Sequence, residues 1–115
     1  MVATVNISTE SDADFRRAFV YQTVSGVPID LTGSAFHMRL RARAEDATVA
    51  MELTTENGRI VVLDAVNGKF ELIIEQEDLE RLTAGEYDQS LIRSRDGAQS
   101  RVWRGTFTLG VGPSR

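Results

Sequence analysis

Histidine occurs once in the chain, at position 37, and cysteine does not occur at all. A Ser–His–Asp triad or a histidine-assisted metal centre would therefore have to be built around His37. His37 alternates with Arg39 and Arg41, and nearby positive charge favours the neutral form of an imidazole. No carboxylate lies within a few positions to orient the ring. We interpret His37 as a surface residue, and we predict no catalytic residue, no metal ligand and no enzyme activity.

The densest acidic run consists of Glu71, Glu75, Glu77, Asp78 and Glu80. Paired carboxylates could serve glycoside hydrolysis, but that reaction also needs a sugar cleft lined with aromatic rings. A calcium loop needs alternating acids around a central glycine, and this spacing is missing. The glycines form neither a GxGxxG nor a Walker pattern, so we predict no cofactor-binding residue and no cofactor. The acidic run is interpreted as the solvated face of a short helix.

Basic residues concentrate at Arg39, Arg41 and Arg43, and two interpretations of this stripe are open. The arginines could pair across strands with acids and protect a sheet edge from aggregation. Alternatively, they could bind an acidic surface of a partner protein. Aromatic stacking platforms do not alternate with them, and the net charge is -4, so we predict no nucleic-acid partner.

These side chains need a scaffold, and the alternation of apolar and polar residues predicts strands. The clearest strand is 35–43, where Phe36, Met38 and Leu40 face one way and the basic residues face the other. Further alternating or apolar runs lie at 3–7, 15–21, 49–53, 59–63, 69–74 and 103–111. Between them stand turn pairs such as Asn57-Gly58 and Asn67-Gly68. The pattern indicates an all-β sandwich or barrel.

Residues 75–82 break the alternation, because acids come first and Leu79 and Leu82 are three positions apart. This predicts one short helical crossover near 75–83. Leu82, Gly85 and Tyr87 then have the spacing of a tyrosine corner, a feature of Greek-key sandwiches. We expect the ring of Tyr87 to lie in the core and its hydroxyl to bond to the backbone upstream.

Two polar residues fall on the apolar phase of the strand that follows. Gln89 and Arg93 share the phase of Tyr87 and Leu91. Either this strand lies at a sheet edge, or its inner face meets a partner. Gln89 and Arg93 therefore join Arg39, Arg41 and Arg43 as the candidate partner interface.

A length of 115 residues, with 42% hydrophobic and 26% charged residues, fits one folded domain. We expect residues 1–115 to form a single sandwich with its core between about 15 and 111. No apolar run reaches the roughly 20 residues that a membrane helix needs, so no membrane partner is predicted. Residues 1–7 lack the basic start and apolar stretch of a signal peptide, which predicts synthesis in the cytoplasm.

The order of these elements resembles a family of small tailed-phage and prophage proteins, and it is similar to the N-terminal immunoglobulin-like domain of phage baseplate upper proteins. The resemblance covers residues 15–111 and runs through the segments 27–33, 35–43, 52–60, 67–70 and 82–87 to Asp96-Gly97 and the closing strand. It implies an immunoglobulin-like antiparallel sandwich of about seven to eight strands. It also implies a component in or near the virion tail that works by protein–protein contact. The chain departs from the family pattern at Gln89 and Arg93, where apolar residues are more usual.

Our hypothesis is a structural and assembly protein of a phage or prophage tail, associated with the baseplate or a fibre. Its partners would be other virion proteins or further copies of itself, with no small-molecule substrate. It would reside in the virion after synthesis in the host cytoplasm. The alternative is a carbohydrate- or host-receptor-binding module, which would expose aromatic residues such as Trp103, Tyr21 and Phe36 together. The phase that Trp103 shares with Phe107 favours a core position over an interface.

Overall fold

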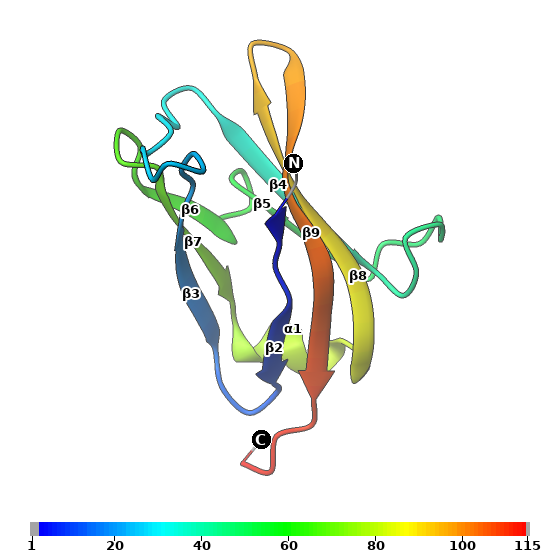
Figure 1. The fold of residues 1–115 in the computed structure, drawn as a ribbon. Helices are drawn as coiled ribbons and strands as arrows, with labels where there is room; N and C mark the ends of the chain where they lie inside the picture. The colour runs from blue at the N-terminus through cyan, green and yellow to red at the C-terminus, as the bar shows by residue number, and fades with distance from the viewer. Residues whose placement is uncertain (1–2, 115) are drawn as a thin grey trace.

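Two β-sheets pack face to face in the computed structural model, which describes residues 3–114 (Figure 1). The large sheet contains β1 (Ala3–Thr4), β2 (Ile7–Glu10), β4 (Ala35–Arg41), β5 (Met51–Thr54), β8 (Gly85–Arg95) and β9 (Ala98–Gly110). Its order is β1-β9-β8-β4-β5, and β2 also pairs with β9. The small sheet contains β3 (Phe15–Val20), β6 (Ile60–Asp64) and β7 (Lys69–Ile74), in the order β3-β7-β6. The predicted all-β sandwich is confirmed.

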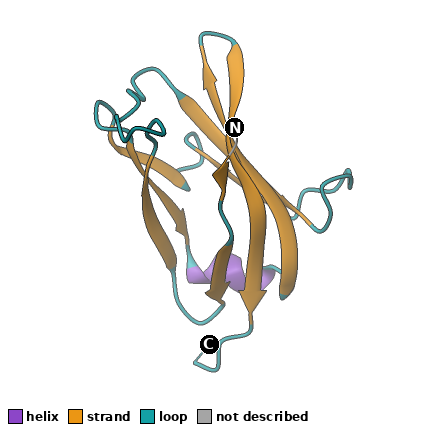
Figure 2. Ribbon diagram, viewed as in Figure 1, coloured by secondary structure: helices purple, strands orange, loops and turns teal. Residues whose placement is uncertain are grey.

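The helix α1 (Gln76–Arg81) closes one end between the sheets and lies within the predicted range (Figure 2). Its acids Glu77 and Asp78 stand in the first turn, where the helix dipole favours negative charge. Leu79 is its buried residue and anchors it to the core. Among the described residues, no helix is long and apolar enough to span a membrane.

The N-terminal run differs from the prediction of one strand over residues 3–7. It divides into β1 and β2, and both run parallel to β9, so the large sheet is not purely antiparallel. The division falls at Val5 and Asn6, where the chain passes over Gly105 of β9. Met1, Val2 and Arg115 lie outside the described residues. The prediction that residues 1–7 are not a signal peptide therefore falls partly on residues that the structure does not describe.

The alternation predicted for 35–43 is confirmed over β4, but not at its end: the strand stops at Arg41, and Ala42, expected on the buried face, is exposed. Phe36, Met38 and Leu40 are buried, whereas His37 and Arg39 face away from the core. The buried side chains of both sheets form one apolar cluster, within which the ring of Phe70 stacks on those of Phe36 and Trp103. Burial of this apolar surface holds the sheets together, at roughly 25 cal/mol for each Å² removed from water.

The tyrosine corner is also confirmed. Tyr87 lies at the start of β8 with its ring buried, and its hydroxyl donates a hydrogen bond to the backbone oxygen of Thr83. This bond ties β8 to the segment that leaves α1. Burial raises the pKa of the Tyr87 hydroxyl above its ordinary value.

Candidate functional site

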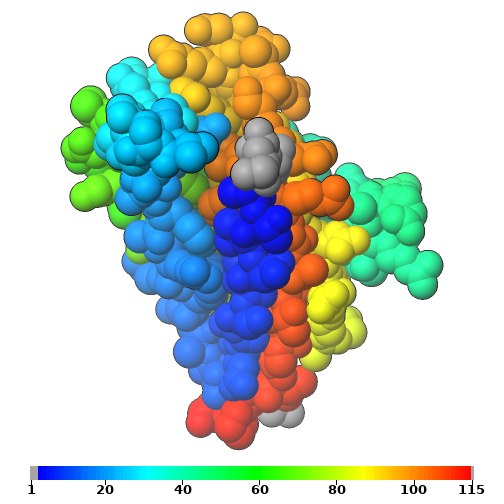
Figure 3. All heavy atoms as spheres, viewed as in Figure 1, coloured from blue at the N-terminus to red at the C-terminus, as the bar shows by residue number. Residues whose placement is uncertain are grey.

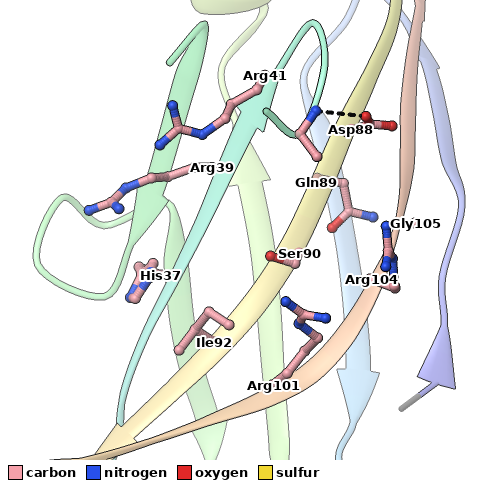
Figure 4. Close-up of a pocket in the computed structure, with 11 residues that line it drawn as sticks. His37, Arg39, Arg41, Asp88, Gln89, Ser90, Ile92, Arg101, Arg104 and Gly105 are labelled. Atoms are coloured by element: carbon pink, nitrogen blue, oxygen red, sulfur yellow. Dashed lines mark hydrogen bonds between the residues drawn. The ribbon is translucent and has the colours of Figure 1, made fainter. Parts of the chain in front are cut away.

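A basic hollow opens on the outer face of the large sheet, with a volume of about 360 Å³ (Figure 4). Its charged walls are Arg39 and Arg41 from β4, Arg101 and Arg104 from β9, and one carboxylate, that of Asp88 from β8. His37 also lines it. We call this feature the basic hollow.

Strand register explains why the arginines surround a depression. Arg39 pairs with Ser90 on β8, and Ser90 pairs with Arg104 on β9, so the two arginines flank a small side chain. In the neighbouring row, Ile92 separates His37 from Arg101 in the same way. A serine between two long cationic side chains leaves the space that forms the hollow.

An irregularity in β9 places two arginines on this face although they are three positions apart. Leu91 pairs with Trp103, but Ile92 pairs with Arg101, so Val102 is an extra residue in the ladder. In a regular strand, residues three apart point to opposite faces. The bulge lets Val102 and Trp103 both be buried, and it turns Arg101 and Arg104 outward together.

Arg101 and Arg104 were not among the residues predicted from the sequence, although a signal for them is present there. The segment Arg101-Val102-Trp103-Arg104 interrupts the alternation with an apolar pair between two charges. Such a pair inside an alternating strand is what a bulge with both residues buried requires.

The cations of the hollow differ in their local pairing. The Nε of Arg39 lies 2.5 Å from a carboxylate oxygen of Glu52 on β5, which is the cross-strand pairing described by one of the two interpretations of the stripe. That bond holds the pKa of Glu52 below its usual range. By contrast, Arg101 and Arg104 are exposed, and their side chains have no hydrogen-bond or ion-pair partner within residues 3–114.

His37 carries no sign of activation. Burial is the main cause that lowers its pKa, and the charge of Arg39 lowers it further. Glu52 has a smaller opposing effect. The ring is therefore neutral near pH 7 and contributes shape and hydrogen-bonding capacity to the hollow rather than charge. Across the described residues, no group of three or more His, Cys, Asp or Glu side chains could hold a metal ion.

The segment that follows β4 borders the hollow and stands out from the molecule. Figure 3 shows it in teal, clear of the body of the domain. We call residues 42–50 the projecting loop. The guanidinium of Arg41 donates to the backbone oxygens of Asp46 and Ala47, at 2.7 and 2.8 Å. The amide of Ala44, which lines the hollow, donates to the carboxylate of Asp88 at 2.9 Å (Figure 4).

The structure divides the five predicted interface residues among three places. Arg39 and Arg41 line the basic hollow. Arg43 lies in the projecting loop, where it is exposed and does not line the hollow. Gln89 also borders the hollow, but its side chain, like that of Arg93, is hydrogen-bonded within the domain.

The sheet-edge explanation offered for the polar phase of β8 is wrong, and the interface explanation stays a prediction for Gln89. β8 lies between β9 and β4, so it is not an edge strand. Gln89 is 5% exposed, and its side chain is hydrogen-bonded within the domain. Its amide nitrogen donates to the backbone oxygens of Val5 and Thr106, and its amide oxygen accepts from the indole of Trp103. The buried amide thus has partners for both its nitrogen and its oxygen inside the domain.

Arg93 holds a loop at the far end of the sandwich. Its Nε donates to the hydroxyl of Ser34 and its Nη2 to the backbone oxygen of Asp30, both at 2.8 Å. Its guanidinium lies 6.0 Å from the ring centre of Tyr21. Arg93 can occupy the apolar phase of β8 because the strand continues past the end of the core at this point.

Known proteins were compared with the chain by sequence and by structure. No family model and no curated protein matches the chain. Among solved structures, the chain is similar to the N-terminal domain of phage TP901-1 ORF48, with 19% sequence identity and a TM-score of 0.48. The match covers 93% of this chain and 84% of that chain.

Proposed function

We propose that the chain is a structural and assembly protein of a phage or prophage tail, associated with the baseplate or a fibre, and that it acts by protein–protein contact. The resemblance of its element order to small tailed-phage proteins supports the location. The basic hollow supports the mode of action, and it is the observation on which that part of the proposal depends. The role requires no catalytic residue and no cofactor.

The hollow has the properties of a contact surface for an acidic protein. Two of its cations, Arg101 and Arg104, have no partner in the described part of the chain. Guanidinium groups present several donors in a plane and bind carboxylates in two-point fashion. They project from paired strands, so the binding geometry is largely formed before the partner arrives, which lowers the entropic cost of association.

The carbohydrate- or receptor-binding alternative has less support. Such a module would expose aromatic rings together, whereas Trp103 is 4% exposed and Phe36 is 1% exposed. Tyr21 is half-buried against the core. The core position expected for Trp103 is confirmed, and the three rings do not form an exposed platform.

Particle composition tests the proposal. Tails purified from the source strain after induction should contain the chain in a fixed ratio to other tail proteins, measured by quantitative mass spectrometry. The double variant Arg101→Glu with Arg104→Glu should fold but be depleted from particles, because charge reversal opposes an acidic partner. Glu77→Gln, at an exposed position on α1, serves as the control and should be incorporated normally. Absence of the unmodified chain from purified particles would overturn the proposal.

A further inference from the structure

We infer that the acidic partner of the basic hollow is a second copy of this chain, which inserts its projecting loop while receiving the loop of the first. The carboxylates of Glu45 and Asp46 in each loop would pair with Arg101 and Arg104 of the opposite hollow. This inference rests on the proposed function, because it takes the hollow as the contact surface and names what occupies it.

The projecting loop has the charge that the hollow requires. Glu45 is exposed, and the carboxylates of Glu45 and Asp46 have no hydrogen-bond or ion-pair partner among residues 3–114. The loop also contains Arg43, so two carboxylates oppose one guanidinium and its formal charge is negative. Within residues 3–114, therefore, the anions Glu45 and Asp46 of the loop and the cations Arg101 and Arg104 of the hollow beside it are all unpaired.

The loop is also shaped for insertion. It stands clear of the domain in the space-filling view (Figure 3), yet it is fixed at its base. The guanidinium of Arg41 donates hydrogen bonds to the backbone oxygens of Asp46 and Ala47. The backbone amide of Asp46 donates to the backbone oxygen of Arg43 at 3.0 Å, which forms a turn. The hydrogen bond from Ala44 to Asp88 holds the other side. A loop ordered before binding loses little entropy when it docks.

The relative position of loop and hollow favours a closed dimer. Ala44 of the loop lines the hollow, so the two features are adjacent on one face of the large sheet. A two-fold axis between them places each loop over the hollow of the other copy. Such an interface is isologous, because each contact occurs twice, and it leaves no unpaired loop or hollow to recruit a third copy.

A different acidic surface of a second copy lies on α1 and the residue before it. Glu75 and Glu80 are exposed there, at the closed end of the sandwich. Insertion of that end into the hollow would be head-to-tail and would build a ring or an open chain. The loop is preferred because it borders the hollow and forms a closed pair, and the two arrangements predict opposite results for charge reversal.

The test is a charge-swap series on the full chain, followed by sedimentation velocity across a concentration and salt series. The unmodified chain should form a dimer that weakens as salt rises. Arg101→Glu with Arg104→Glu should raise the dissociation constant about tenfold or more, and so should Glu45→Arg with Asp46→Arg. The variant that carries all four changes should return to within about threefold of the unmodified chain, because the reversed charges again face opposite signs. Circular dichroism should show the same fold for every variant, since these positions lie at the surface.

Glu75→Arg with Glu80→Arg is the matched control and should leave the dimer intact. The inference is overturned if the chain stays monomeric at about millimolar concentration, near the weak limit of specific association. It is also overturned if the variant with all four changes does not regain dimer affinity. A third contrary result is that charge reversal on α1 dissociates the dimer while charge reversal in the loop does not. Particle composition separates this outcome from the proposed function: a monomeric chain found in purified tails would refute the dimer and leave the tail role standing.

Discussion

The indole nitrogen of Trp103 donates a hydrogen bond to the amide oxygen of Gln89, across 2.8 Å of the buried interior. The amide nitrogen of the same glutamine donates to the backbone oxygen of Val5, also at 2.8 Å. The side chain of Gln89 therefore links its own strand, β8, to β9 and to the point where the N-terminal segment divides into β1 and β2. Gln89 thus belongs to the internal framework of the large sheet.

Replacement of Gln89 by alanine should destabilise the domain. The change leaves the indole of Trp103 and the oxygen of Val5 without partners in a buried setting, and each lost partner costs about 1–3 kcal/mol. Chemical denaturation should show a lower free energy of unfolding. Ser90→Ala is the control, since Ser90 is the next residue on the outer face, and its change should stay within about 0.5 kcal/mol. Equal stability of the two variants would contradict the role given to Gln89.

Gly105 is predicted to tolerate no side chain. A Cβ at this position would lie 2.0 Å from the backbone oxygen of Val5, so Gly105→Ala must displace the N-terminal segment or β9. We expect a loss of roughly 1–3 kcal/mol, the usual cost of overpacking. Faster proteolysis near Val5 should accompany it, because the segment would lift from β9.

Gly110→Ala provides the comparison for this prediction. Its added Cβ would meet the side chain of Glu10 at 3.4 Å, and that side chain can move. The variant should have the same free energy of unfolding and the same rate of proteolysis as the unmodified chain. If Gly105→Ala behaved the same way, the close approach of Val5 would not be a constraint on the fold.

The elements of this fold were predictable from the sequence where a single local pattern decides them. Alternation around Phe36, Met38 and Leu40 predicted β4, and the spacing that ends at Tyr87 predicted the corner. Both depend on residues close in the chain. The short helix followed from acids that precede the leucine at 79.

The polar residues of β8 could not be assigned correctly from their own strand. Gln89 looked like an edge or interface residue because its partners, Val5 and Trp103, come from distant parts of the chain. Alternation indicates which face a residue occupies, but it does not indicate what crosses that face. A buried amide is satisfied only in three dimensions.

The basic hollow was half predictable for a similar reason. Arg39 and Arg41 formed a visible stripe in the sequence. Arg101 and Arg104 are three positions apart and would point to opposite faces of a regular strand, but the bulge in β9 places both on the outer face. Only the pairing of β8 with both β4 and β9 brings the two sets together. Register between distant strands is the information that the sequence did not provide.

Arg93 is predicted to hold the loop at residues 30–34 through two donors that lysine cannot supply together. Its Nε and Nη2 reach different acceptors, Ser34 and Asp30, whereas a lysine ammonium is a single point on a flexible stem. Arg93→Lys should therefore speed hydrogen exchange of the amides in residues 30–34. Arg95→Lys, on the exposed end of the same strand, should leave this exchange unchanged. Unaltered exchange in Arg93→Lys would show that the loop is held by other contacts.

Tyr87→Phe should remove the bond to Thr83 and cost about 0.5–1.5 kcal/mol, the range for one net hydrogen bond. Tyr21→Phe is the control, because the Tyr21 hydroxyl has no hydrogen bond within residues 3–114 and its removal should change little. The pKa of Tyr87 adds a second, independent readout. Burial raises it above the ordinary 10.0, so the folded state keeps the proton at a pH where the unfolded chain loses it.

The sign of the pH effect follows from that difference. Below about pH 10 the Tyr87 hydroxyl is protonated in both the folded and the unfolded state, so its contribution to the free energy of unfolding is complete. This contribution declines as the pH rises above the pKa of the unfolded state toward the pKa of the folded state. The unmodified chain should therefore lose stability between neutral and strongly alkaline pH faster than Tyr87→Phe, in urea titrations at matched ionic strength. Tyr21→Phe should follow the unmodified chain. Parallel alkaline profiles for all three proteins would contradict a buried, protonated Tyr87 as the anchor of the corner.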